Sequence, residues 1–238
     1  MHVLRLFFTE ALRVFLLRRT LKEIAGSLGL AVVTITAAGL VAWLFSLDGA
    51  ASDVFQENGP IESVQAWIVL VAGVQFYLAA LRFGFEIFYG TLLLSLGAFL
   101  AVVREIPACE SAFYFGGICL RHSWQGEIQA VIVLLVAGLA LWRREPLARH
   151  LRELNFFWIV PAGTAFAILV AAEVMEGLGQ PVIEETLELA GYLHLLVFAA
   201  ALHLAPHWFD ARQAPQLSEP GVWSWRGRSF LSRREHLR

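Results

Sequence analysis

The chain has 238 residues, of which 58% are hydrophobic and only 16% are charged, and its mean hydropathy is +0.64. The apolar residues are gathered in long blocks and are not spread as amphipathic stripes, which argues against a soluble globular domain and is typical of a polytopic membrane protein. The formal net charge is −2, and the basic residues flank the apolar blocks, so nothing in the composition points to a nucleic-acid partner.

The first segment in chain order, residues 1–24, is basic and amphipathic. Phe7, Phe8 and Phe15 recur between Arg residues, so we expect this segment to lie on the cytoplasmic surface with its aromatic side chains toward lipid. A cleaved signal peptide fits less well, because the charged region is long and the apolar run that follows is long enough to span a membrane.

Residues 25–205 contain six apolar blocks that approach the length of about 20 residues that a helix needs to cross about 30 Å of hydrocarbon. Six such blocks in one chain predict an all-α, polytopic membrane protein: a bundle of six transmembrane helices with an amino-terminal amphipathic helix at the interface. The remaining residues, 206–238, show little periodicity and are predicted to form an irregular cytoplasmic tail. The predicted spans are Leu28–Leu47, Val64–Leu81, Ile87–Val103, Ile128–Trp142, Phe156–Ala172 and Leu187–Ala205.

The charges predict an orientation. Sixteen of the 18 basic residues fall on one side of these six spans, and only Arg104 and Arg121 fall on the other. The positive-inside rule then places both termini in the cytoplasm, and we expect the chain to lie in a bacterial inner (plasma) membrane. Twelve of the 20 acids lie in or beside the outward loops, so twelve acids and two arginines give the outer side a formal charge of −10.

Two outward loops lead into a helix that begins with proline and carries a carboxylate in its first turn. In QENGPIESVQAW, Pro60 suits the first helical turn because its missing N–H has no partner there, and Glu62 lies near the positive end of the helix dipole. GQPVIEETLE repeats the arrangement with Pro181 and Glu184. Local helix chemistry therefore explains part of the acidic pattern.

Other acids extend further into the spans. Glu184 and Glu188 are four residues apart and share a helix face, which places Glu188 a turn or more inside the sixth span. Carboxylates at the edge of hydrocarbon are costly unless they are protonated, paired with a cation or facing a wet cavity. We therefore predict a polar pocket at the outer rim. Its candidate residues are Glu57, Glu62, Arg104, Glu105, Arg121, Glu173, Glu176, Glu184, Glu185 and Glu188.

The pattern leaves the role of this pocket open. Either outward arginine could pair with the acids in a structural ion-pair network. Alternatively, the carboxylates bind a proton or a divalent cation, with oxygen ligands favouring calcium and an added imidazole favouring zinc. His194 lies about 80° around the helix from Glu184, so no metal ligand set is predicted and no cofactor is assigned.

The only two cysteines, Cys109 and Cys119, fall in the connection between the third and fourth spans. In an oxidising periplasm they would form a disulfide that closes this loop. The alternative is a pair of free thiols buried in a short apolar interfacial or re-entrant segment.

Three short motifs resemble those of a set of uncharacterised bacterial inner-membrane proteins. ENGPIE opens the second span, Arg104 and Glu105 close the third, and EETLELAGYLHLL begins the last, matching E-[DN]-G-x-x-E, Arg-Glu and E-E-x-x-E over Gln56 to Leu204. The resemblance implies family membership and no particular activity. Glu57 and Asn58 are also similar to the Glu-Asn of ceramidase-like membrane hydrolases, but the outward histidine cluster that such a zinc site needs is missing.

We expect a non-enzymatic accessory or scaffold component that presents the acidic pocket to a partner or cation. The lipid bilayer is its first partner, with other membrane-protein subunits or a homo-oligomer as further ones. Gly90, Gly97, Gly138 and Gly163 are predicted to permit close helix packing. The alternatives are a metal-dependent lipid hydrolase and a proton- or cation-coupled transporter, although a transporter should carry polar residues at mid-membrane and on both sides.

Overall fold

The computed structural model describes residues 21–47, 54–55, 60–83, 85–111, 118–143, 156–206 and 209. Within these residues the prediction of an all-helical chain is confirmed, and six helices are each long and apolar enough to cross a membrane. The helices are α2 (Leu21–Leu47), α4 (Pro60–Arg82), α5 (Phe85–Glu105), α6 (His122–Arg143), α8 (Phe156–Gly177) and α9 (Pro181–Leu204). Most of the predicted surface segment and nearly all of the predicted tail lie outside the described residues.

Five of the six described helices begin earlier than the apolar blocks predict, α2 by seven residues and α5 by two. α4 begins at Pro60, four residues before Val64, because the polar first turn is already helical. α9 likewise begins at Pro181 and includes Glu184 in its first turn. α6 begins at His122, six residues before the predicted start. Proline and carboxylates favour a helix N-terminus, which explains the early starts of α4 and α9; α6 has no acidic residue in its first turn.

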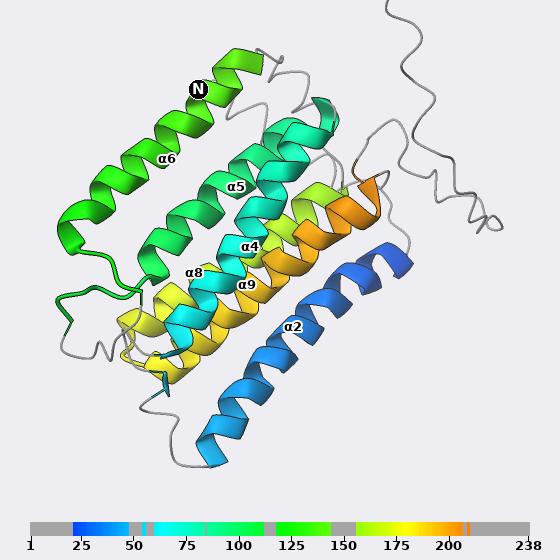
Figure 1. Ribbon diagram of the computed structural model, residues 1–238. Helices are drawn as coiled ribbons and strands as arrows, with labels where there is room; N and C mark the ends of the chain where they lie inside the picture. Colours follow the sequence, from blue (N-terminus) through cyan, green and yellow to red (C-terminus); the bar gives the residue numbers. More distant parts are fainter. Residues whose placement is uncertain are drawn as a thin grey trace, which may run out of the picture.

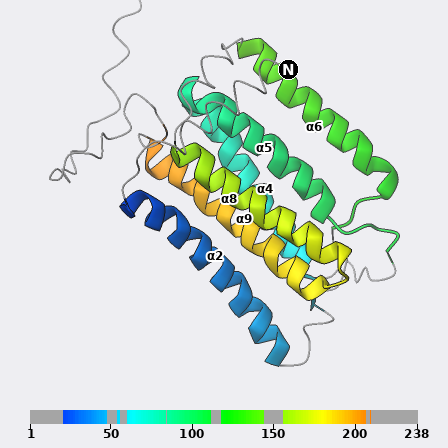
Figure 2. The ribbon, with the colours of Figure 1, turned by 180° about the vertical axis from the view of Figure 1, so that it is seen from behind.

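The helices form a bundle in which α9 has a central place (Figure 1). α9 packs against α2, α4 and α8, while α4 packs against α5. α2 and α6 lie at opposite edges of the bundle in both views (Figures 1 and 2). α6 packs mainly against α5, and none of its residues is buried.

Aromatic side chains build the core where α4, α8 and α9 meet. Phe198 on α9 contacts Phe76 on α4 and Trp158 on α8 edge to face, with ring centroids 5.6 and 5.8 Å apart. The Trp158 indole N–H donates a hydrogen bond to the main-chain oxygen of Phe209 at 3.1 Å. Trp158 is therefore held both by packing and by a polar bond.

The predicted close packing at glycines is confirmed at one position. A Cβ built at Gly90 would lie 2.8 Å from the Trp158 ring, so the backbone of α5 lies directly against this side chain of α8. The prediction is wrong for three glycines that face open space within the described part of the chain, Gly97, Gly138 and Gly163. Close approaches not predicted from the sequence occur at Gly73 and Gly191.

A tight turn joins α8 to α9. Gly179 adopts a φ of 66°, a left-handed conformation that glycine accepts without strain. Its N–H donates to the Glu176 carbonyl at 2.8 Å and the Gln180 N–H donates to the Met175 carbonyl at 3.0 Å, the two bonds of a Schellman motif. This turn fixes the acidic end of α8 beside the acidic start of α9.

Candidate functional site

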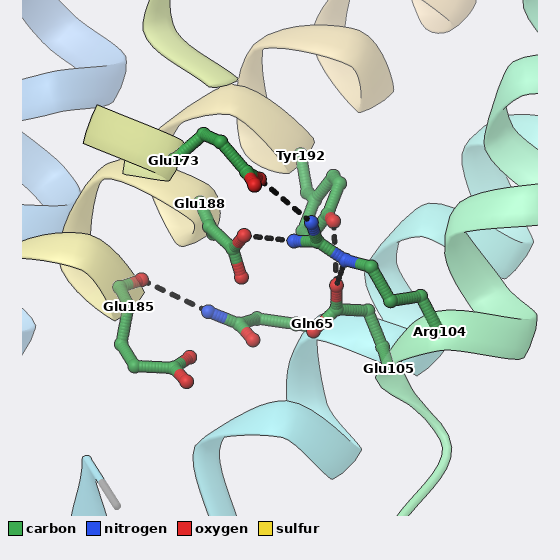
Figure 3. Close-up of polar contacts among 7 residues, drawn as sticks. All are labelled: Gln65, Arg104, Glu105, Glu173, Glu185, Glu188 and Tyr192. Carbon is green, nitrogen blue, oxygen red and sulfur yellow. Dashed lines mark hydrogen bonds and ion pairs between the residues drawn. The ribbon is translucent and has the colours of Figure 1, made fainter. Parts of the chain in front are cut away.

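One end of the bundle gathers most of the polar side chains. α4 and α9 begin at this end, and their neighbours α5 and α8 end there (Figure 1). Four helices therefore contribute polar groups to one small region, which is drawn in Figure 3. We call this region the Arg104 cluster and define it as Gln65, Arg104, Glu105, Glu173, Glu185, Glu188 and Tyr192.

Arg104 joins three of these helices (Figure 3). From the last turn of α5, its Nη2 donates to Glu188 Oε1 on α9, and its Nη1 lies 3.6 Å from Glu173 Oε2 on α8. Its Nε donates to Glu105 Oε1 at 3.0 Å. A planar guanidinium with five N–H groups suits this arrangement, because it serves several carboxylates from fixed directions.

Glu105 receives a second hydrogen bond, from the Tyr192 hydroxyl on α9, at 2.7 Å. Both residues are almost completely buried. The Glu105 Oε1 atom therefore accepts from Arg104 and Tyr192 together, which compensates a carboxylate that has been removed from solvent. This pair also ties the end of α5 to α9.

The cluster is asymmetric in exposure. The Glu188 and Glu105 side chains are 6% and 3% exposed, whereas those of Arg104 and Glu173 are 50% and 67% exposed. Three ionised carboxylates around one guanidinium give a formal charge of −2. The guanidinium is thus held from behind by buried acids and keeps an accessible side.

A second group of contacts lies between α4 and α9. Gln65 is completely buried, and its Nε2 donates to the main-chain oxygen of Glu185 at 2.9 Å. The Glu185 side chain is also buried, and in Figure 3 it extends away from Arg104. Among the described residues, Gln65 Oε1 and Glu185 Oε2 are buried without a hydrogen-bond partner.

The structure separates the predicted pocket residues into groups. It places Glu105, Glu173 and Glu188 in contact with Arg104, and Glu185 beside Gln65. Glu57 lies outside the described residues. The others lie around the same end without a described contact to Arg104: Glu62 is buried, Glu184 is half-buried, and Arg121 and Glu176 are exposed.

Sequence reasoning missed Gln65 and Tyr192. Both carry a usable signal, since Gln65 follows Glu62 by three residues and Tyr192 follows Glu188 by four, the spacings that share a helix face. A polar side chain one turn further into the span from a predicted rim acid is the pattern that would have identified them.

A pocket of ≈ 350 Å³ opens beside the cluster between α5, α6, α8 and α9. Arg104 and Tyr192 form its polar wall, together with Gln129 of α6. Leu100, Ala101 and Leu169 supply the apolar wall. The accessible side of the guanidinium therefore faces a space of the size that receives a side chain or a small ligand.

A disulfide lies in the connection at the same end. Cys109 and Cys119 are bonded, with their Cα atoms 5.0 Å apart. The Leu120 N–H donates to the Pro107 carbonyl at 2.9 Å, and the Cys109 N–H donates to the Leu120 carbonyl at 3.2 Å. These bonds hold the start of α6 close to the end of α5.

The histidines do not join the cluster. His194 is buried further along α9, with Nδ1 3.5 Å from the Thr34 hydroxyl of α2. Within the part of the chain that the structure describes, no three His, Cys, Asp or Glu residues are grouped so that they could hold a metal ion. The described contacts of the cluster itself are ion pairs and hydrogen bonds.

Comparison of the chain with protein-family models, with curated proteins and with solved structures finds no match.

Proposed function

We propose that this chain is a multi-pass protein of a bacterial inner membrane, with both termini in the cytoplasm and the Arg104 cluster on the outer side. Two independent features support this orientation. The positive-inside rule assigns the arginine-poor end to the outside. The disulfide between Cys109 and Cys119 lies at that same end, and disulfides persist in oxidising compartments such as the periplasm.

In this membrane the chain acts as a non-enzymatic accessory or scaffold component that binds a basic group of a partner subunit. The observation that carries the proposal is the charge of the cluster: three carboxylates surround one guanidinium, and the most exposed of them, Glu173, lies 3.6 Å from Arg104. A partner Lys or Arg side chain would find in Glu173 an anion that is not fully neutralised. The pocket beside Arg104 provides room for the stem of such a side chain.

The test is site-specific photo-crosslinking in intact cells. A photoreactive amino acid replaces Gln129, which lines the pocket, and in a matched variant it replaces Leu141, which is 74% exposed near the opposite end of α6. We expect one discrete protein adduct from position 129 that is lost when Glu173→Gln is added, and none from position 141. An adduct that persists in the Glu173→Gln background, or lipid adducts alone at position 129, would contradict the proposal.

Proton- or cation-coupled transport is the second candidate, and one observation favours it. His194 and Thr34 meet inside the bundle, so buried polar side chains are not confined to the rim. His194 follows Glu185 by nine residues, which corresponds to roughly 14 Å along α9. Ion-flux measurements in vesicles, with His194→Leu as the inactive variant, distinguish this candidate from the accessory role.

A further inference from the structure

Among the described residues, Gln65 and Glu185 contact each other, and each has one buried side-chain oxygen atom that accepts no hydrogen bond. Gln65 is completely buried, and its Nε2 donates to the main-chain oxygen of Glu185 at 2.9 Å. This bond fixes the orientation of the amide, because the flipped amide would set one acceptor against another. Gln65 Oε1 is then left without a donor among the described residues.

Glu185 presents the second oxygen. The residue is 5% exposed, and its Oε2 also lacks a partner within the described part of the chain. Arg104 does not supply one, since its described ion pairs go to Glu105, Glu173 and Glu188. Figure 3 shows the Glu185 carboxyl group turned away from the guanidinium, on the side of the Gln65 amide. An ionised Glu185 would leave two acceptors facing the same dry region between α4 and α9.

We propose that Glu185 is a proton-binding site whose carboxylic acid O–H donates a hydrogen bond to Gln65 Oε1. The carboxylate takes up one proton from the aqueous side on which the cluster opens, and the O–H bond so formed turns an acceptor-only group into a donor. One hydrogen thereby satisfies both unpartnered oxygens. The site holds a proton between α4 and α9, and it does not depend on the partner-binding role of Arg104.

The charges around Glu185 favour this neutral form. Among the described residues of the helices around Glu185, carboxylates outnumber cations at this end, and Arg104 is already engaged by other acids. α2 also packs on α9 but has no charged residue among its described side chains. The charged groups that these helices carry at this end are Glu62 on α4, Arg104 and Glu105 on α5, Glu173 and Glu176 on α8, and Glu184 and Glu188 on α9. An ionised Glu185 would add a buried negative charge among these carboxylates, and Arg104, which could offset it, is already paired with Glu105, Glu173 and Glu188.

Glu188 is a matched control on the same helix. It is buried to the same extent, 5% exposed, but it accepts from the Arg104 guanidinium, whose positive charge favours an ionised carboxylate. Infrared spectra of the full-length protein in lipid nanodiscs at neutral pH report protonated carboxylic acids by their carbonyl stretch. We expect this band in the unmodified protein and in Glu188→Gln, and we expect Glu185→Gln to lose it.

The band should also disappear as the pH is raised, with the acid fraction falling by roughly tenfold per pH unit once half of it has ionised. An unchanged carbonyl band in Glu185→Gln would show that Glu185 is ionised, its oxygens satisfied by water or a cation, and would overturn the proposal. Failure of Glu185→Gln to fold would also count against it, because the glutamine N–H₂ can donate to Gln65 Oε1 as the acid does.

A second measurement uses a hydrophobic carbodiimide, which modifies carboxylic acids in their protonated form. Mass spectrometry of the labelled protein should find the adduct on Glu185 at least about tenfold more than on Glu188, consistent with a protonated and an ionised carboxyl of equal burial. Equal labelling of the two residues would contradict the proposal.

Discussion

At the scale of single residues, Arg104 is the group on which the cluster depends. It is the one cation that contacts the buried carboxylates of Glu105 and Glu188 among the described residues. A buried carboxylate that loses its partner keeps the full cost of desolvation. The stability of this end of the bundle should therefore respond more to the loss of Arg104 than to the loss of any one acid.

We predict that Arg104→Met lowers the free energy of unfolding by about 2–3 kcal/mol, less than the ~3–5 kcal/mol typical of a fully buried pair because the arginine side chain is half exposed. Thermal unfolding of the purified protein in detergent or nanodiscs measures the change. Adding Glu188→Gln to Arg104→Met should recover part of the loss, since it removes the uncompensated charge.

Arg121→Met is the control for this prediction, because Arg121 is the other arginine at the same end and is exposed. Its effect should stay within about 0.5 kcal/mol. Equal stabilities of Arg104→Met and Arg121→Met would show that the ion-pair network around Arg104 contributes nothing to the free energy of unfolding.

At the scale of helices, contacts in which a helix backbone lies directly against a buried side chain are those most easily disrupted by substitution. Gly90 lets α5 come close to the Trp158 ring of α8. That ring is 4% exposed, packs against Phe198 and is held by its bond to the Phe209 carbonyl. Because the ring cannot easily move aside, a methyl group at position 90 must displace a helix.

We predict that Gly90→Ala destabilises the protein by about 1–3 kcal/mol through overpacking against Trp158. Gly97→Ala, on the same helix, is the matched control, because nothing lies within 4 Å of its added Cβ, and it should be neutral or slightly stabilising. Thermal unfolding of both variants tests the pair. Equal stabilities would show that the α5–α8 contact relaxes without cost.

At the scale of the whole molecule, the near-neutral net charge conceals two ends of opposite character. Arg82 and Arg143 lie in the last turns of α4 and α6, at the end opposite the cluster. The acidic turns, the disulfide and the Arg104 cluster share the other end. The proposed orientation explains this difference in charge between the two ends, and the orientation can be tested directly.

We predict that a phosphatase active only in the periplasm stays inactive when fused after Arg238, whereas a fluorescent protein that matures in the cytoplasm becomes fluorescent there. In a variant with both cysteines replaced by serine, a new cysteine at the exposed position Glu176 should react in intact cells with a membrane-impermeant maleimide. An active phosphatase, or labelling at Glu176→Cys only after the cells are permeabilised, would reverse the proposed topology.

The sequence by itself predicted the six long apolar helices of the described residues, because burial in hydrocarbon depends on the summed apolarity of about 20 consecutive residues. It also predicted which acids and which arginines lie near one rim, since in an antiparallel bundle the ends of successive helices alternate. The helix starts predicted at Pro60 and Pro181 are confirmed, although the apolar blocks alone begin later because the first turns of these helices are polar.

Only the tertiary structure decided which residues meet. Each residue turns about 100° around a helix, so the partners of Arg104 depend on the rotation and tilt of α5, α8 and α9 relative to one another, which hydropathy does not encode. For the same reason Glu185 turned toward Gln65 and Glu188 toward Arg104, although the two acids are three residues apart on one helix. The order of residues in the sequence predicted a group of acids at the rim. Helix packing decided that some of them pair with Arg104, whereas Glu185 is buried beside Gln65 between α4 and α9.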